Sequence, residues 1–236
     1  MENKDILIGV LVFLLCMAIY VIYNFLNYYV YPLDYKAVRY DDLTLRTGDL
    51  LFVLQYSSPH NFVSGEQFSH VGIIVVVNNI PHVLELVYPY VSCTEFTRRV
   101  MSVAEGQTFY IKSVMADVKM PPRLIEEAKN IKYSDKVISY ALGTTLLSKE
   151  EINHYITNNK TGICSTFVLW VLDKFKLLDV DIKTPKIITW LANDYNKYHL
   201  PTRRIRFFDG TANVGFSDHV NIIMGKNGAL SKVNTY

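Results

Sequence analysis

The sequence predicts an α+β domain that follows one membrane-spanning helix. Three observations predict it: an apolar run opens the 236-residue chain, strand-like segments cluster behind it, and helix-like periodicity follows these strands. Half of the residues are hydrophobic and 19% are charged, which is typical of a globular chain and not of a disordered one. The length leaves room for one domain of ordinary size beside the apolar segment.

Charge and cysteine content exclude two classes of protein. The chain has 24 Lys and Arg residues against 22 Asp and Glu residues, a net charge of +2, which supplies no electrostatic case for a nucleic-acid partner. The three cysteines, an odd number, cannot build a disulfide framework. A nucleic-acid-binding module and a small disulfide-stabilised secreted fold are therefore not expected.

Residues 1–31 are expected to form a transmembrane anchor with a short N-terminal tail. No charged residue occurs from Ile6 to Tyr31, and about 20 apolar residues suffice to cross a hydrocarbon core about 30 Å thick. A cleaved signal peptide is the alternative, but the run is too long, Glu2 and Asp5 stand where a basic start is usual, and no small-residue cleavage site follows. The first expected partner is therefore a lipid bilayer.

Charges on either side of this run predict its orientation. One lysine precedes the run, whereas Lys36, Arg39 and Arg46 follow it, which favours a cytoplasmic location for the rest of the chain. The abundance of Tyr, Asn and Lys codons suits an AT-rich genome, viral or bacterial, so a virion or a host membrane is a second possible location.

Residues 32–47 are expected to be a polar linker and residues 48–236 a single domain. The apolar run Leu50–Leu54 predicts a buried strand, and Val71–Val77 is dense in β-branched residues. Asn78-Asn79 suits a tight hairpin turn, because Asn tolerates a positive φ. Further strands are expected at Val83–Val87, Thr108–Val114, Ile205–Phe208 and Val220–Met224.

The period changes to that of a helix after the prolines at 121 and 122. Thr184 and Pro185 have the order of an N-cap and a first helical residue. Helices are expected over residues 124–131, after the capping box Ser148-x-x-Glu151, over Ser165–Lys176 and over Ile187–Tyr195.

Cys164 is the candidate nucleophile. It stands at the start of the helix expected over Ser165–Lys176, where unpaired backbone N–H groups and the positive end of the helix dipole stabilise a thiolate. A nearby imidazolium stabilises a thiolate further. The alternative is a buried cysteine that packs as a small apolar residue. Cys16 lies in the apolar run and Cys93 lies among polar residues, so neither is expected at a site.

His70 and Glu85 are expected to complete the site. His70 lies between a polar turn and a strand, so its ring could project into a cleft and act as the base for a thiol. The alternative is a histidine whose ring bonds a backbone carbonyl at a strand edge. Glu85 interrupts an apolar strand, and burying a carboxylate is costly unless it is paired. A hairpin at Asn78-Asn79 would bring it beside the His70 strand. His82, on the opposite face, is an alternative orienting group.

Other patterns that carry chemistry are weak. The histidines at 60, 70 and 82 lack metal-ligand spacing, and no cysteine has a second one three positions away. Neither a glycine-rich phosphate loop nor a G-x-S-x-G elbow occurs in the sequence, so no cofactor and no metal is expected. The cluster Arg203-Arg204-x-Arg206 is interpreted as a solvated strand face, which could also touch anionic lipid.

Three segments together resemble the circularly permuted branch of the NlpC-type papain-like cysteine hydrolase superfamily. That branch includes YiiX-like proteins, members in large DNA viruses and, more distantly, the lecithin:retinol acyltransferase group, and in it the His-bearing strand precedes the nucleophilic Cys. The matching segments are Gly48-Asp49-Leu50-Leu51-Phe52, then Phe68-Ser69-His70-Val71-Gly72-Ile73-Ile74 with Glu85 behind it, and Cys164-Ser165-Thr166-Phe167-Val168.

The resemblance covers about residues 48–175 and implies a permuted papain-like domain with an antiparallel sheet and packed helices. It implies Cys164 as nucleophile, His70 as base and Glu85 as the third polar residue. The sequence departs from the family at Thr166, where an acidic residue is common, and the residues after about 176 have no counterpart.

The function expected from these observations is that of a membrane-anchored cysteine hydrolase or acyltransferase. The bond is an amide, an ester or a thioester, and an anchor beside the site favours a lipid or lipidated substrate over a cell-wall peptide. Two alternatives stay open: a catalytically inert structural or docking protein of a membrane or virion, and a peptidoglycan peptidase that faces outward.

Overall fold

The computed structural model describes residues 3–29, 35–55, 61, 64–101, 107–134, 148–180, 182, 184 and 186–206. The strand predicted at Val220–Met224 lies outside these residues, as do Phe208 and Pro185.

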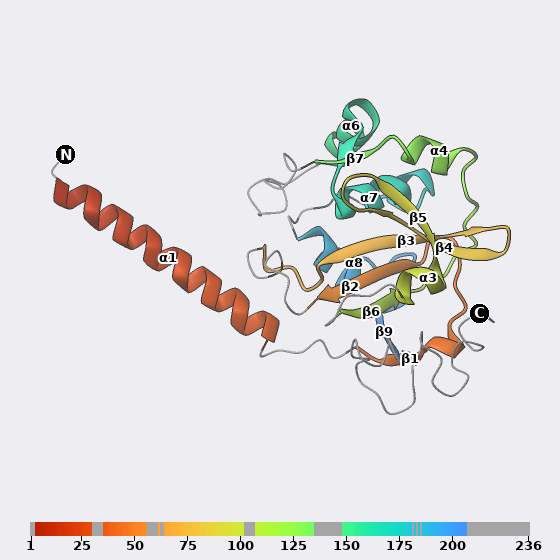
Figure 1. Cartoon of the computed structure of the whole chain (residues 1–236), viewed down its shortest axis with the longest axis horizontal. Helices are drawn as coiled ribbons and strands as arrows, with labels where there is room; N and C mark the ends of the chain where they lie inside the picture. The colour runs from red at the N-terminus through yellow and green to blue at the C-terminus, as the bar shows by residue number, and fades with distance from the viewer. Residues whose placement is uncertain are drawn as a thin grey trace.

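Helices and strands follow one another in the order typical of the α+β class, which confirms the predicted class (Figure 1). The helices are α1 (Asn3–Tyr29), the 3-10 helix η1 (Tyr40–Asp42), α3 (Phe96–Met101), α4 (Leu124–Ala128), α6 (Lys149–Asn159), α7 (Cys164–Lys174) and α8 (Ile187–Asn193). The strands are β1 (Ala37–Arg39), β2 (Leu50–Gln55), β3 (His70–Val77), β4 (Ile80–Leu86), β5 (Val91–Glu95), β6 (Gln107–Lys112), β7 (Lys132–Tyr133), β8 (Thr161–Gly162) and β9 (Arg203–Arg206).

The N-terminal helix α1 is long and apolar enough to cross a membrane. Its segment Lys4–Tyr23 has a mean hydropathy of 2.9, and none of it is buried against the rest of the chain. Figure 1 shows α1 extending away from the domain. The apolar side chains of α1 are not covered by the rest of the chain, and exposing them to water costs free energy. A lipid bilayer would cover them, which is the environment that the sequence predicts for this helix.

Seven strands form one mixed sheet in the order β1-β9-β6-β2-β3-β4-β5. Neighbouring strands run antiparallel except β1 and β9, which are parallel, so the antiparallel sheet implied by the resemblance is wrong at this edge. The hairpin between β3 and β4 turns at Asn78 and Asn79, whose φ angles of 52° and 64° confirm the predicted turn.

Residues 37–42 lie within the range predicted as a linker, yet they form β1 and η1. The register pairs Ala37 with Arg204 and Arg39 with Arg206, and Val38 packs on the cluster that holds Ile205. A strand of three residues has no local signal, because its stability comes from pairing with a strand more than 160 residues away in sequence.

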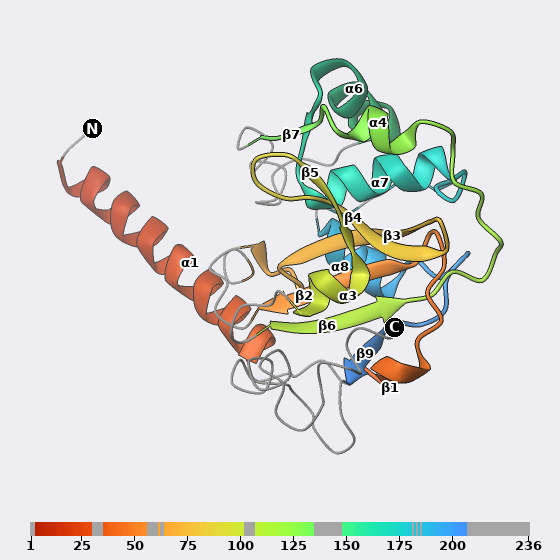
Figure 2. The same ribbon diagram turned by 45° about the vertical axis from the view of Figure 1, so that its right-hand side comes forward.

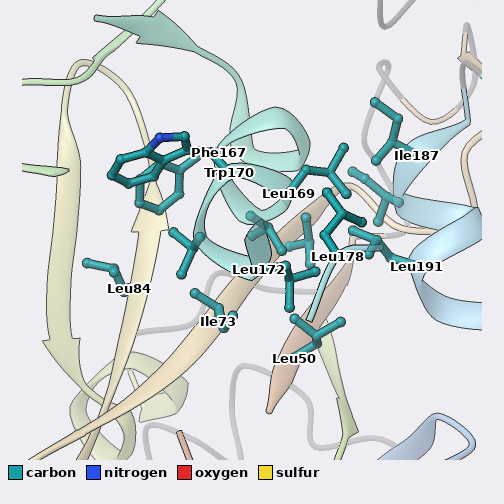
Figure 3. Close-up of a cluster of buried hydrophobic side chains, with 14 of the residues drawn as sticks. Leu50, Ile73, Leu84, Phe167, Leu169, Trp170, Leu172, Leu178, Ile187 and Leu191 are labelled. Carbon is teal, nitrogen blue, oxygen red and sulfur yellow. The ribbon is translucent and has the colours of Figure 1, made fainter. Parts of the chain in front are cut away.

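Both faces of the sheet are covered, which explains the unbroken apolar run of β2. On one face, Leu50 and its alternate neighbours pack under α7 and α8; Figure 3 shows this cluster, with Ile73 and Leu84 from the sheet below Leu169 and Leu172 of α7. On the other face, Leu51 packs with residues of α3. Figure 2 shows α7 and α3 on opposite sides of the strands.

Two helix starts test the predicted caps. At α6 the capping box is confirmed, because Ser148 N donates to Glu151 Oε2 at 2.7 Å and Glu151 N donates to Ser148 Oγ at 3.1 Å. At α8 the predicted N-cap Thr184 is wrong. The buried carboxylate of Glu66 accepts the N–H groups of Ile188 and Thr189 at 3.3 and 2.9 Å, so a distant segment caps this helix.

Candidate active site

The hairpin of β3 and β4 brings His70 and Glu85 together. His70 is the first residue of β3, and its Nε2 lies 2.7 Å from Glu85 Oε2. The Glu85 side chain is 2% exposed, whereas that of His70 is 18% exposed. Because Glu85 contacts Nε2, the ring nitrogen left for a second partner is Nδ1. Glu85 thus fixes the orientation of the imidazole.

Gly72 provides the space for this contact. A Cβ at position 72 would lie 2.8 Å from Val83 Cγ1 and 3.2 Å from the Cβ of Glu85, distances at which a side chain does not fit. The glycine in the Ser-His-Val-Gly segment therefore lets β4 approach β3 closely at the residue that carries the carboxylate.

Arg99 is the member of the site that sequence reasoning missed. Its Nε donates to Glu85 Oε1 at 2.5 Å, so the two oxygens of one buried carboxylate bind two different side chains. Its guanidinium carbon also lies 5.8 Å from the centre of the Phe109 ring. Arg99 comes from α3, a six-residue helix without a marked pattern; the one available signal was that Glu85 required a partner.

Cys164 is the first residue of α7, and its side chain is partly exposed. It lies close enough to His70 to raise the pKa of that imidazole. Thr166 stabilises the turn before the helix, because its Oγ1 accepts from Ile163 N at 3.0 Å and donates to Ile163 O at 3.1 Å. In this chain the hydroxyl of Thr166 thus caps the start of α7, at the position where an acidic residue is common in the family that the sequence resembles.

Charges within the site shift two of its pKa values. Burial on its own lowers the pKa of His70, but the charge of and hydrogen bond to Cys164, followed by those of Glu85, outweigh it and raise the pKa to about 10. Burial likewise opposes ionisation of Glu85, but His70 and Arg99 together hold the pKa of its carboxyl below the usual range. The site therefore favours an ionised carboxylate beside a protonated imidazole.

Other residues considered from the sequence lie apart from this arrangement. The Nδ1 of His82 lies 2.9 Å from Ile80 O on its own strand, so His82 does not orient His70. Cys16 and Cys93 are exposed on α1 and β5. His60 lies outside the described residues. Within the described ranges, no group of three or more His, Cys, Asp or Glu side chains is placed to hold a metal ion.

Comparisons with known proteins add a distant likeness to a solved structure. No protein-family model matches the chain, and no curated protein matches it. Among solved structures, it is similar to the metalloprotein YiiX from Escherichia coli O157:H7, with a TM-score of 0.38 and 16% identity over 69% of this chain and 89% of that one.

Proposed function

We propose that this chain is a membrane-anchored thiol hydrolase or acyltransferase with a permuted papain-like fold, in which Cys164 is the nucleophile, His70 the acid–base residue and Glu85 the orienting carboxylate. The observation that carries the proposal is the contact of His70 with Glu85 at 2.7 Å, together with Cys164 close enough to His70 to raise its pKa. A thiol, an imidazole and a carboxylate in this order are the requirements for an activated cysteine nucleophile.

The proposed reaction begins with the proton of the Cys164 thiol on His70. The thiolate sulfur attacks a carbonyl carbon and forms a tetrahedral adduct, and the imidazolium then protonates the leaving amine, alcohol or thiol as its bond to that carbon breaks. In the second half, His70 takes a proton from water or from an acceptor nucleophile, which attacks the thioester. Expulsion of the Cys164 sulfur restores the starting state.

Two features of the fold support this sequence of steps. The backbone N–H groups at the start of α7 have no partner within the helix, so they can donate to the oxyanion that forms next to Cys164. Glu85 stabilises the imidazolium, and Arg99 holds Glu85 ionised and in place. Since Arg99 acts through Glu85, it is a positioning residue.

The helix α1 supports a substrate class. An enzyme tethered to a bilayer meets lipids and lipidated chains at high local concentration, so a fatty acyl ester, thioester or amide is the proposed substrate. Whether water or a second molecule accepts the acyl group decides between hydrolysis and transfer.

Thiol alkylation tests the proposal without knowledge of the substrate. The detergent-solubilised full chain is treated with iodoacetamide across pH, and labelling of Cys164 and Cys93 is followed by peptide mass spectrometry. Cys164 is expected to react fast near neutral pH and to lose this advantage in His70→Ala. Cys93, whose thiol pKa is raised by burial, is the internal reference in each sample, so the deciding comparison is the wild type against His70→Ala.

Two results would oppose the proposal. Labelling of Cys164 no faster than that of Cys93, or the same in His70→Ala, indicates an inert scaffold that retains the fold. To separate loss of chemistry from loss of folding, His82→Ala is the matched control, because the ring of this histidine hydrogen-bonds Ile80 O and not a residue of the site.

A further inference from the structure

The edge of the sheet formed by β1 and β9 carries an excess of positive charge. Residues 36–39 and 203–206 contain five of the 24 Lys and Arg residues of the chain, and no Asp or Glu. We call this surface the basic edge; its cationic residues are Lys36, Arg39, Arg203, Arg204 and Arg206. Both views place β1 and β9 at the end of the domain opposite α4 (Figures 1 and 2).

The strand register places three of these charges, Arg39, Arg204 and Arg206, on one face of the sheet. Arg39 is the direct partner of Arg206, and paired residues project from the same face of a sheet. Arg204 stands two residues before Arg206 on the same strand, so it shares that face. Like charges directly opposite each other are destabilising, which is a cost that a bound anion removes.

Within the described chain, Arg39 and Arg203 have polar partners, and the charge of Arg203 also acts on the carboxyl of Asp49. Arg39 lies 3.4 Å from Asp41 and 3.9 Å from Asp42, in exposed pairs of little strength. Arg203 Nη2 donates to Ser113 Oγ at 2.9 Å. The Nε atoms of Arg203, Arg204 and Arg206 are buried, and none has a hydrogen-bond partner in the part of the chain that the structure covers. Because these Nε atoms are closed to solvent, an external ligand would bind the partly exposed side chains through their terminal guanidinium nitrogens.

The chain connection keeps this surface near the bilayer. Helix α1 ends at Tyr29 and β1 begins at Ala37, so seven residues separate them. At 3.3–3.6 Å per residue a fully extended connection spans at most about 29 Å. The basic edge can therefore reach the headgroups on the side of the membrane where α1 ends.

We infer that the basic edge binds the anionic lipid headgroups of the membrane that holds α1. The phosphate and carboxylate oxygens of such lipids accept the forked hydrogen bonds that guanidinium groups offer. Contact at β1 and β9 fixes how the tethered domain is oriented over the bilayer. The inference rests on α1 being the membrane anchor proposed above.

Energy transfer from tryptophan to a lipid dye measures this contact in the full chain. The chain is reconstituted into phosphatidylcholine vesicles that contain dansyl-phosphatidylethanolamine, with or without phosphatidylserine, and flotation of the vesicles reports insertion of α1. Transfer from Trp170 and Trp190 is expected to be higher with phosphatidylserine, to fall as salt screens the contact, and to resist free inorganic phosphate at the same ionic strength.

The double variant Arg204→Glu/Arg206→Glu is expected to lose the part of the transfer that depends on phosphatidylserine and still float with the vesicles. The milder variant Arg204→Gln/Arg206→Gln is expected to lose a smaller share of the phosphatidylserine-dependent transfer. It keeps the test valid if the charge-reversed chain does not fold. Lys119→Glu/Lys129→Glu is the matched control, because it changes the net charge equally at exposed sites next to α4. This control is expected to behave as the wild type.

Three results would overturn the inference. With α1 inserted, equal transfer in both lipid compositions means that the basic edge does not bind anionic lipid. An equal loss in the Lys119/Lys129 control means that net charge, and not this surface, draws the domain to the membrane. Failure of the wild-type chain to float with the vesicles would show that α1 is not a membrane anchor. This result is distinguishable from the other two, because in both of those the chain floats.

Discussion

Arg99 and His70 are held by opposite oxygens of the same carboxylate. Arg99 Nε donates to Oε1 of Glu85 at 2.5 Å, and Oε2 lies 2.7 Å from His70 Nε2. Because the Glu85 side chain is 2% exposed, water cannot replace either partner easily. The guanidinium thereby controls both the position and the ionisation of the group that orients the proposed base.

The first prediction follows from this geometry. Arg99→Met is expected to slow alkylation of Cys164 by about tenfold or more, since a hydrogen bond to a charged group contributes about 1.5–3 kcal/mol. Without the guanidinium the pKa of Glu85 rises, so the acid limb of the alkylation profile moves to higher pH. Arg98→Met, at an exposed position on the same helix, is the control. An equal effect of the Arg98 change would show that α3 is merely destabilised.

The second prediction concerns the proton on His70. The pKa of this residue is raised from 6.5 to about 10, first by Cys164 and then by Glu85, against the effect of burial. Cys164→Ser is expected to lower it well below 10, which a nuclear magnetic resonance titration of labelled histidine rings measures. The His199 ring, whose pKa burial lowers to about 4, should titrate as before. A His70 pKa that is unchanged by the substitution would show that Cys164 does not interact with His70.

The same shift has a consequence for stability. A histidine whose folded pKa is raised stabilises the fold fully below its ordinary pKa of 6.5, and this contribution disappears as the pH rises through about 10. The free energy of unfolding of the wild type relative to His70→Gln is therefore expected to decline between these two values. A difference that grew with pH would mean that the ring is neutral in the folded chain.

The third prediction concerns the glycine between the two strands. Gly72→Ala is expected to destabilise the chain by about 1–3 kcal/mol, because overpacking forces neighbours aside. It should also slow Cys164 alkylation, since the new Cβ would press on Val83 and on the Cβ of Glu85. The nearest atom is a Val83 methyl, so Gly72→Ala/Val83→Ala should recover part of both losses. Strictly additive effects in this double-mutant cycle would contradict the contact.

The fourth prediction concerns a buried lysine outside the site. Lys112 Nζ donates to Ala192 O at 2.9 Å, and burial lowers the pKa of the lysine to about 8. Lys112→Met is expected to stabilise the chain by about 1–3 kcal/mol at pH 7, because it removes a costly buried charge. Thr202 Oγ1 still donates to the same carbonyl at 2.7 Å.

The pH dependence tests this interpretation of Lys112. A lowered lysine pKa means that the charge destabilises the fold fully below about pH 8 and not at all above the ordinary value of 10.5. Denaturant unfolding of the detergent-solubilised chain should therefore show the gain at pH 7 and not above pH 10.5. Lys119→Met, at an exposed position, should change nothing. A loss of stability in Lys112→Met would show that its hydrogen bond matters more than its charge.

Local patterns were sufficient wherever a segment carries its own signal. The apolar run of α1 and the turn at Asn78-Asn79 both appear in the structure as predicted. The capping box at Ser148 and the start of α7 near Cys164 do so as well. Each depends on neighbours within a few residues, through hydropathy, backbone torsion or the unpaired groups of a helix end.

Elements that depend on distant partners were missed or misassigned. β1 lies in what the sequence predicted as a linker, because its pairing strand is β9. The Thr184 cap was wrong because Glu66 supplies the acceptor for α8. Arg99 could not be assigned, because nothing in a short helix records which carboxylate it will meet.

By itself, the sequence determined that an apolar N-terminal helix precedes an α+β domain, and that Cys164, His70 and Glu85 are candidates for one site. Only the tertiary structure decided that Glu85 is shared between His70 and Arg99, and that five cations line one sheet edge. The physical reason is that hydropathy and local torsions act over a few residues, whereas charge pairing and burial depend on which strands pack together.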